Sequence, residues 1–309
     1  MTPVADLAYV RFRAPDLDRM EAFLTDFGLV RSARTETALY MRGSDPQHHL
    51  HVTELGEPAF LGVGLEARSL ADLEALAGCA GAGAVEPIEE PGGGQRVRLR
   101  DPNGVGLEVV HGIERLAPLP LPAPRRLNTG ACRGRVGEPQ QVAKGPAHVK
   151  RLGHFVLLVN DFRETEAFYH ERFGFRNSDE VYLGERSQVL AAFMRLDRGE
   201  DYVDHHAFLA VGAGRVELNH VSFEVHDLDD LMTGHEHLRA GGYAHHWGVG
   251  RHVVGSQIYD YWRDPFGHVL EHWTDGDLLN AKSEPGGVPI AGPGPESHWG
   301  PPAPSPFGA

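Results

Sequence analysis

The chain of 309 residues repeats its own pattern of strands and helices. The segments LAYVRFRAPDLDRMEAFLTDFGLV (7–30) and LGHFVLLVNDFRETEAFYHERFGF (152–175) both predict a strand, an Asp-centred turn and a helix. The segments VGLEARSLADLEAL (63–76) and VSFEVHDLDDLMTG (221–234) both predict an alternating strand that leads into a helix. Because an internal repeat constrains the fold more than any local propensity, we expect one structural design to be used twice.

A third pair of segments completes each half of the chain. RLRDPNGVGLEVV (98–110) and YWRDPFGHVLEHW (261–273) each predict two strands joined by an Asp-Pro-x-Gly turn, in which Pro presets φ and Gly tolerates a positive φ. The pieces follow one another in the same order in both halves. Each half therefore holds two strand–helix–strands modules, which predicts an α+β fold.

Two segments without periodicity interrupt this pattern. Residues 116–145 are rich in Pro, Gly and Arg, which predicts a linker or an extended loop. Residues 283–309 are rich in Pro and Gly, so we expect this tail to lie over the surface or to be disordered and to add little core. The predicted domains are then residues 1–115 and residues 146–282.

Composition and charge exclude several kinds of partner. The sequence has no run of about 18 apolar residues and no basic, then hydrophobic, leader, so we expect neither membrane insertion nor secretion but a cytoplasmic protein. The net charge of -14 opposes binding to the phosphates of nucleic acids. Two cysteines, Cys79 and Cys132, are too few for a disulfide framework or a thiolate metal site.

Histidine is the unusual residue in this composition, because most of the 19 histidines lie in the second half. Aligning the repeats sets His154 against Tyr9 and His220 against Gly62. If folding required these two imidazoles, the first half should need them as well. The comparison therefore favours a functional role for both histidines over a role in packing.

A carboxylate completes this pair of histidines, because Glu271 aligns with Glu108 of the first half. His154, His220 and Glu271 can meet only through tertiary structure. If they meet, they form a facial triad that leaves open positions for substrate and O2 on a non-haem Fe(II). A structural zinc site would need four closed ligands, usually with thiolates, and this region has no cysteine.

These residues resemble those of the type I extradiol catechol dioxygenases, which belong to the vicinal oxygen chelate superfamily, also called the glyoxalase–bleomycin resistance–dioxygenase superfamily. The resemblance covers nearly the whole chain, and GRHVVGSQIYDYWRDPFGHVLEHWTDGD (250–277) is similar to the signature that ends in the metal-ligand Glu. It implies four βαβββ modules paired into two domains, the first without a metal site. It also implies that His154, His220 and Glu271 hold Fe(II), or less often Mn(II).

Three more positions match roles in this family. His206 lies 14 residues before the second ligand histidine and is similar to an acid–base histidine; the resemblance implies that it deprotonates the catechol. His252 and Tyr261 are similar to residues that hydrogen-bond oxygens of the substrate. They are nine residues apart, so in one extended strand they would point to opposite faces, and a bend or bulge near Gly255 is needed to bring both to one pocket.

At two positions expected to contact the substrate, this sequence differs from members of the family. Some members that bind acidic catechols carry Arg at the position of Trp247, so we expect no carboxylate clamp here. Trp247, with Phe193 and Trp262 as weaker candidates, indicates an apolar or bulky aromatic substituent on the substrate. Ser256 stands where some relatives carry an amide side chain and is a second candidate for a substrate contact.

The other histidines have less specific interpretations. QHHLHV (47–52) looks like a metal motif, but the first half lacks matching ligands, so we interpret His49 and His51 as part of an ordinary surface or half-buried strand. His245 and His246 either line the pocket or lie in a solvated loop.

The resemblance implies an enzyme that inserts both atoms of O2 into a catechol to give a ring-opened semialdehyde, and one that forms a homo-oligomer. One alternative is a redox-neutral, metal-dependent lyase or isomerase of the glyoxalase type, which would share ligands between paired modules. Another is a non-catalytic ligand-binding resistance protein, which would have no use for His206, His252 and Tyr261. The sequence leaves open the particular catechol, the ring bond that is cleaved, and iron versus manganese.

Overall fold

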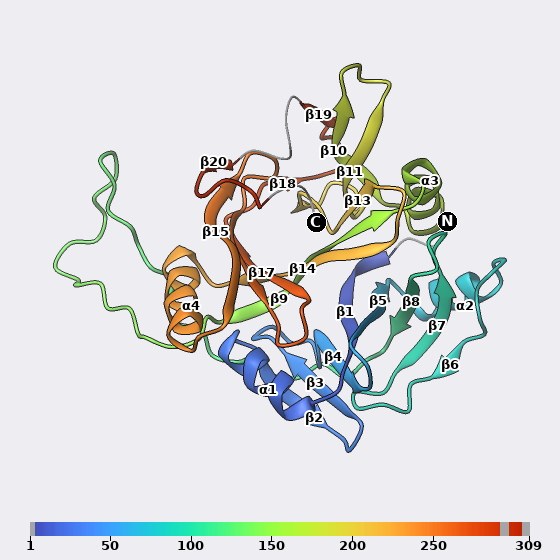
Figure 1. The fold of residues 1–309 in the computed structure, drawn as a ribbon, viewed down its shortest axis with the longest axis horizontal. Helices are drawn as coiled ribbons and strands as arrows, with labels where there is room; N and C mark the ends of the chain where they lie inside the picture. The colour runs from blue at the N-terminus through green and yellow to red at the C-terminus, as the bar shows by residue number, and fades with distance from the viewer. Residues whose placement is uncertain (1–3, 291–296, 305–309) are drawn as a thin grey trace.

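The computed structural model describes residues 4–290 and 297–304. Its first half forms an eight-stranded sheet with the order β2-β3-β4-β1-β5-β8-β7-β6 (Figure 1). The elements of this half are β1 (Val4–Ala14), α1 (Leu17–Asp26), β2 (Val30–Arg34), β3 (Ala38–Arg42), β4 (His51–Leu55), β5 (Ala59–Ala67), α2 (Leu70–Ala77), β6 (Glu86–Pro87), β7 (Gln95–Arg100) and β8 (Gly106–His111). They make two successive βαβββ modules, joined where β1 pairs antiparallel with β5.

The second half repeats this order within a ten-stranded sheet, β19-β10-β11-β13-β9-β14-β17-β16-β15-β20. Its modules consist of β9 (Val149–Val159), α3 (Phe162–Phe173), β10 (Arg176–Leu183), β11 (Val189–Arg195), β13 (Phe208–Gly212), β14 (Glu217–Val225), α4 (Leu228–Ala240), β15 (Ala244–His252), β16 (Ile258–Arg263) and β17 (Val269–Thr274). The short strands β12 (Val203–Asp204) and β18 (Leu278–Leu279) pair with each other. The predicted α+β fold of four βαβββ modules is confirmed.

The helices begin at the polar residues that follow the first strand of each module. The side chains of Asp16, Ser69, Asp161 and Asp227 each accept a hydrogen bond from the backbone N–H three residues later. Such N-caps satisfy a backbone donor that the first turn of a helix leaves free. The two modules of each half therefore change from strand to helix at equivalent positions.

The two halves share one hydrophobic core. Helix α1 contacts α4, while on the other flank Arg172 of α3 donates a hydrogen bond to the carbonyl oxygen of Ala80 (Figure 1). Between the flanks, the ring of His272 stacks on Phe27 with 3.8 Å between ring centroids, and its Nε2 lies 2.7 Å from the Phe27 carbonyl oxygen. The second sheet, which holds the candidate site, is therefore supported by the first half.

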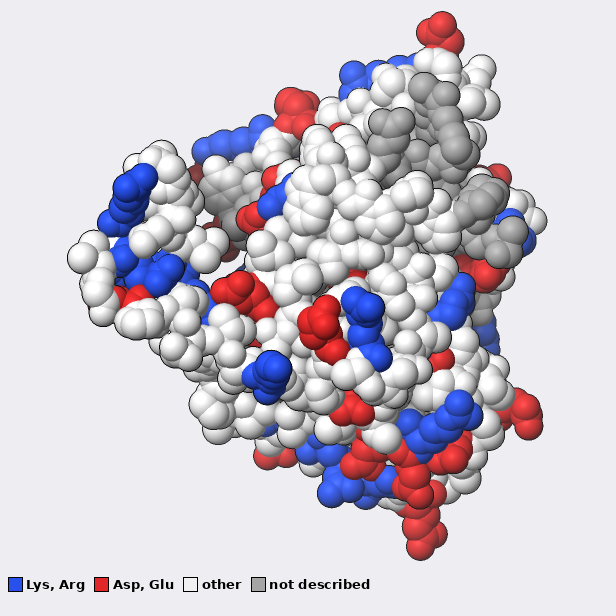
Figure 2. All heavy atoms as spheres, turned by 60° about the vertical axis from the view of Figure 1, so that its left-hand side comes forward, with Lys and Arg blue, Asp and Glu red and all other residues white. Residues whose placement is uncertain are grey.

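The predicted linker, residues 116–145, contains no helix or strand. It forms the long loop that projects from the body of the molecule, and Lys and Arg side chains gather on it (Figures 1 and 2). Val136 on this loop is 81% exposed. The domain boundaries at residues 115 and 146 stay a prediction.

Parts of the tail, which was expected to lie over the surface or to be disordered, form strands at the edges of the second sheet. Strand β19 (Gly286–Ile290) pairs parallel with β10, and β20 (Ser297–Trp299) pairs antiparallel with β15, so the tail extends both edges of the sheet. An edge strand uses only some of its backbone groups for pairing, so a segment rich in Pro and Gly can still join a sheet. Residues 291–296 and 305–309 of the predicted tail lie outside the described residues.

No helix within residues 4–290 and 297–304 combines the length and the apolar character that crossing a bilayer requires.

Candidate metal centre

Three neighbouring strands bring the predicted metal ligands together. His154 on β9 and Glu271 on β17 both lie opposite Ser222 of β14, and His220 precedes Ser222 by two residues on the same strand. Residues two apart in a strand share a face, so all three side chains point to one side of the sheet. Nε2 of His154 lies 3.0 Å and Nε2 of His220 lies 3.4 Å from Glu271 Oε2, and the two nitrogens are 3.4 Å apart.

The surroundings of Glu271 fit a bound cation. Its side chain is fully buried, and among the residues that the structure describes neither carboxylate oxygen has a hydrogen-bond partner of good geometry. A buried carboxylate without such partners is costly, whereas a cation between the three ligand atoms would satisfy it. Two imidazoles and one carboxylate on one face are the donor set of a facial triad, which Fe(II) and Mn(II) both accept.

The protonation states also suit metal binding. Burial alone raises the pKa of Glu271, but His154, His220 and His252 together hold it well below its usual value. Burial lowers the pKa of His154, so its ring is neutral. Metal ligands must be deprotonated, and both groups are already in that form.

A chain of three side chains leads away from the centre on one side. The ring centroid of His206 lies 4.1 Å from that of His154, and burial lowers the pKa of His206 well below its usual value. Nδ1 of His206 lies 3.2 Å from Nδ1 of His205, and Nε2 of His205 lies 2.7 Å from Asp179 Oδ2. His206 is thus a neutral imidazole beside the ligands, connected through His205 to a carboxylate on β10.

This connection sets the tautomers of both histidines. The carboxylate of Asp179 can only accept, so His205 carries a hydrogen on Nε2, and in the neutral form of His205 the Nδ1 is then an acceptor. The facing Nδ1 of His206 must then be the donor. The unprotonated nitrogen of His206 is therefore Nε2, the atom that is free to accept a proton.

A hairpin brings His252 and Tyr261 together on the other side of the centre. His252 ends β15 and Tyr261 lies in the antiparallel strand β16, with a turn between them in which Gly255 has a φ of 77°. Nε2 of His252 lies 2.9 Å from the Tyr261 hydroxyl and 3.5 Å from Glu271 Oε1. The two residues therefore belong to separate strands. The chain reverses at the turn that contains Gly255, and this reversal, in place of a bulge within one strand, brings both side chains together.

The candidate substrate contacts lie in different places. Trp247 stacks on Tyr261 with 5.3 Å between ring centroids, and its Nε1–H donates to the carbonyl oxygen of Pro301 in the tail. The ring of Phe193 lies 5.0 Å from that of His206. Trp262 is fully buried on the opposite face of β16, away from the triad.

Ser256 lies at the tip of the hairpin. Its hydroxyl donates to Asp277 Oδ2, and its carbonyl oxygen accepts from Arg251. Its backbone has a φ of 57°, which is uncommon for a residue other than glycine. These bonds hold the turn together and do not support a substrate contact, which stays a prediction.

Sequence reasoning missed three residues that orient the site. Asn219 Oδ1 lies 2.6 Å from Nδ1 of His220 and so leaves Nε2 to face the other ligands. The pair of Asp179 and His205 fixes the tautomer of His206, as described above. Asn219 adjoins a predicted ligand, which is a weak signal, whereas nothing in the sequence connects Asp179 with His205.

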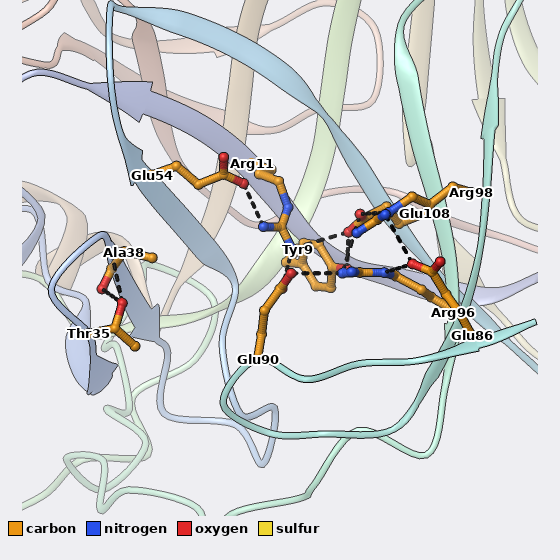
Figure 3. Close-up of polar contacts among 10 residues, drawn as sticks. All are labelled: Tyr9, Arg11, Thr35, Ala38, Glu54, Glu86, Glu90, Arg96, Arg98 and Glu108. Atoms are coloured by element: carbon orange, nitrogen blue, oxygen red, sulfur yellow. Dashed lines mark hydrogen bonds and ion pairs between the residues drawn. The ribbon is translucent and has the colours of Figure 1, made fainter.

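Different side chains fill the equivalent position in the first half (Figure 3). The hydroxyl of Tyr9 donates to Glu108 Oε2 over 2.6 Å, and the guanidinium of Arg11 lies 3.2 Å from the same oxygen. Arg11 also contacts Glu90 at 2.6 Å and Glu54 at 2.7 Å. The guanidinium of Arg11, together with those of Arg96 and Arg98, thus neutralises the carboxylates of the first half, whereas the equivalent carboxylate of the second half faces two imidazoles.

The prediction for QHHLHV differs from the structure in burial. His51 is fully buried against Phe12, and His49 is buried between Tyr9 and Tyr40. Neither belongs to a cluster of metal-ligating residues among those that the structure describes. Of this segment only His51 and Val52 belong to strand β4, so the expected strand is shorter than residues 47–52 and its histidines are buried in the core.

Comparisons with known proteins found similar sequences and folds. The Glyoxalase/Bleomycin resistance protein/Dioxygenase superfamily matches residues 151–272. Metapyrocatechase 2 of Cupriavidus necator is 28% identical over 308 residues, which are 98% of this chain and 91% of that protein. The 3-methylcatechol 2,3-dioxygenase of Pseudomonas putida is 25% identical over 279 residues, 86% of this chain and 88% of that protein.

The fold is also similar to that of solved structures. The Mn(II)-bound glyoxalase from Novosphingobium aromaticivorans has a TM-score of 0.77 at 24% identity, covering 94% of this chain and 89% of that one. All three ligands of the candidate centre lie in the matched segment 151–272. Residues 151–272 are therefore similar to the Glyoxalase/Bleomycin resistance protein/Dioxygenase superfamily, and the sequence relatives of the chain include extradiol dioxygenases.

Proposed function

We propose that the chain is an extradiol dioxygenase, which inserts both atoms of O2 into a catechol and opens its ring to a semialdehyde. The observation that carries this proposal is the convergence of His154, His220 and Glu271 on one face, with His206 and the pair of His252 and Tyr261 on either side. The sequence relatives named metapyrocatechase and 3-methylcatechol 2,3-dioxygenase support the same activity.

We infer that the triad holds Fe(II), with Mn(II) as the second candidate. The donor set suits either ion. Two imidazoles with one carboxylate form the facial triad typical of Fe(II), and the carboxylate is a ligand that also suits Mn(II). When bound, such an ion supplies open positions for an aromatic diol and O2 and a route for electrons between them.

His206 takes the first proton in this proposal. A catechol hydroxyl that approaches the triad gives its proton to the unprotonated Nε2 of His206. The hydrogen bond from Nδ1 of His206 to His205 keeps that nitrogen free, and the carboxylate of Asp179 stabilises the positive charge that the transfer creates. The same imidazolium can return the proton to an oxygen of the product.

His252 and Tyr261 orient oxygens of the reactants. Burial raises the pKa of Tyr261 well above its usual value, so the hydroxyl stays protonated and can donate a hydrogen bond. His252 holds this hydroxyl at 2.9 Å, and both residues lie on the face that bears Glu271. Donors fixed in place before the reaction stabilise developing negative charge without reorganising.

The aromatic rings beside the centre favour an apolar substituent on the catechol. Phe193 lies next to His206, and Trp247 lies behind Tyr261. We expect catechols with alkyl or aryl substituents to be better substrates than catechols with a carboxylate. The homo-oligomeric state and the cytoplasmic location stay predictions.

A redox-neutral lyase or isomerase is the alternative within this fold. As predicted from the sequence, such an enzyme would share ligands between paired modules. Tyr9 and Arg11 fill the equivalent position of the first half, while the second half supplies a complete triad alone. This arrangement favours the dioxygenase.

Oxygen uptake tests the proposal. The protein is loaded with Fe(II) without oxygen, and O2 consumption and visible absorbance are followed after adding catechol, an alkylcatechol, an arylcatechol and a carboxylated catechol. We expect stoichiometric uptake and a yellow product from the natural chain, uptake in the control His237→Ala, and none in His154→Ala. A natural chain that binds the metal but consumes no O2 with any of these diols would exclude the proposed activity.

A further inference from the structure

We propose that His235, His245 and Asp260 form a second site for a divalent transition-metal ion. The three residues come from α4, β15 and β16, and their ligand atoms lie within 4.8 Å of one another. Nε2 of His245 lies 2.8 Å from Asp260 Oδ1, and Nδ1 of His235 lies 3.2 Å from Oδ1 and 3.1 Å from Oδ2. The donor set, two imidazoles and one carboxylate, is the same as in the first centre.

This second site is separate from the first and does not rest on the proposed function. Asp260 and Tyr261 are neighbours in β16, so their side chains point to opposite faces of the sheet. Tyr261 faces the triad, whereas Asp260 faces helix α4, which supplies His235. The same strand therefore contributes to a candidate centre on each of its faces.

The charge of Asp260 favours a cation at this position. Its side chain is fully buried, and among the described residues its ion-pair partners are imidazoles only, without Arg or Lys. Burial alone raises the pKa of Asp260, but its contacts with His235, His245 and Trp262 hold it below its usual value, so it stays ionised. A buried carboxylate needs a positive partner, and a metal ion held between the carboxylate and the two imidazoles would supply one.

The geometry around Asp260 is that of a supported ligand. Trp262 Nε1–H donates to Oδ2 over 2.5 Å and fixes the carboxylate, while Oδ1 faces the nitrogen of His245. Such an outer hydrogen bond commonly orients a metal-binding carboxylate. Separations of 2.8–3.2 Å between ligand atoms match neighbouring ligands around an ion whose bonds are about 2.1 Å long.

The donors also indicate which ions would bind. Imidazole nitrogen suits Zn(II), Co(II) and Ni(II), whereas Ca(II) and Mg(II) prefer sites made of oxygen alone. The side chain of His245 is 31% exposed, so an ion can enter from solvent and keep a water ligand on that side.

An ion at this site would tie helix α4 to the hairpin of β15 and β16. That hairpin carries His252 and Tyr261 on its other face. A ligand that binds only the folded state raises the free energy of unfolding, and the increase grows with the logarithm of the ligand concentration relative to Kd. The site would thus make the hairpin's stability depend on the supply of metal.

Zinc binding to a chain without the first centre tests this proposal. In the variant His154→Ala/His220→Ala, equilibrium dialysis against Zn(II) should find one bound equivalent, and Zn(II) should raise the melting temperature. Adding His245→Ala should abolish that equivalent or weaken its binding at least about 100-fold, because it removes a direct ligand. The matched control adds His237→Ala instead, since His237 lies on the same helix and contacts only one carboxylate, Asp26.

A second measurement covers the case in which the double variant does not fold. The natural chain should bind two equivalents of Zn(II), and His245→Ala should bind one, with the natural and variant chains unfolding at similar temperatures in the presence of a chelator. If His245→Ala binds as many equivalents of Zn(II) as the natural chain, the three side chains form a hydrogen-bonded network without a metal, and the proposal is overturned.

Discussion

Single residues in this chain determine which tautomer of a neighbouring histidine is present. Asp179 and His205 lie outside the triad, yet they determine which nitrogen of His206 can accept a proton. Asn219 does the same for His220. The chemistry of the site therefore depends on side chains that touch neither metal nor substrate, and these give tests that leave the ligands intact.

Replacing Asp179 should slow the reaction without weakening substrate binding. In Asp179→Asn the amide can donate as well as accept, so His205 no longer favours one tautomer of His206. We expect kcat to fall about tenfold, as is usual when an orienting partner is lost, and KM for the catechol to stay nearly the same. Steady-state kinetics measure both.

Glu180→Gln is the matched control for this substitution, because Glu180 is the next carboxylate on β10 and contacts Asn177 instead of His205. It should keep the natural kcat, and Asp179→Glu should recover part of the loss. Equal losses in the Asn and Gln variants would show that Asp179 acts only through the stability of β10.

His51 should make the protein less stable in acid. Burial lowers the pKa of His51 from its usual 6.5 to about 3, so between these values the unfolded chain binds a proton that the folded chain does not. Stability is then complete above pH 6.5 and falls as the pH drops below it, by about 2 kcal/mol between pH 7 and pH 5. Urea unfolding of the natural chain and of His51→Phe at both pH values measures this difference, and an unchanged difference in the variant would contradict it.

At the scale of elements, the hairpin of β15 and β16 carries residues of both candidate centres. Its turn contains Gly255 with a φ of 77°, where an added Cβ would lie 3.0 Å from Nδ1 of His205. Its strands carry His252 and Tyr261 on one face and Asp260 on the other. The turn therefore approaches His205 at Nδ1, whereas Asp179 contacts Nε2 of the same ring.

Gly255→Ala should impair catalysis in addition to stability. The positive φ costs an alanine about 1 kcal/mol, and the new methyl group also presses on His205. Gly184→Ala is the matched control, because Gly184 has a φ of 67° and nothing within 4 Å of its added Cβ. Chemical unfolding should show similar losses in both variants, whereas only Gly255→Ala should lower kcat; an equal kcat in both would contradict the contact with His205.

Elements differ in how much the sequence reveals of them. The modules could be predicted because a buried strand, a cap and an amphipathic helix leave a periodic pattern that recurs at equivalent positions. The ligands could be predicted because His154 and His220 have no histidine opposite them in the first half. The tail strands β19 and β20 could not, since edge pairing uses backbone groups and leaves no such pattern.

At the scale of the whole molecule, the two halves have the same fold and different electrostatics. The first half closes its carboxylates with Arg11, while the second half leaves Glu271 for a cation. Stacking of His272 on Phe27 joins the halves directly behind the strand that carries Glu271. We infer that the first half stabilises the second half by packing against it.

Replacing Arg11 tests whether the first half contributes stability without affecting the metal centre of the second half. Arg11→Met removes a cation that three carboxylates share, although Arg96 and Arg98 still pair with two of them, so the free energy of unfolding should fall by about 2 kcal/mol. Arg115→Met, which breaks the more exposed pair with Glu66, should cost less than about 1 kcal/mol. Neither variant should change the metal content of the second half, and loss of that metal in the folded Arg11→Met variant would contradict the inferred support role.

The reaction of the loaded enzyme with labelled oxygen tests the central claim most directly. The Fe(II)-loaded chain is given an alkylcatechol under 18O2, and the product is trapped at once and analysed by mass spectrometry. We predict a ring-opened product that carries both atoms of one O2 molecule, and no labelled product from His154→Ala. An isomer or cleavage product of the substrate without labelled oxygen would contradict the account and indicate a redox-neutral enzyme in the same fold.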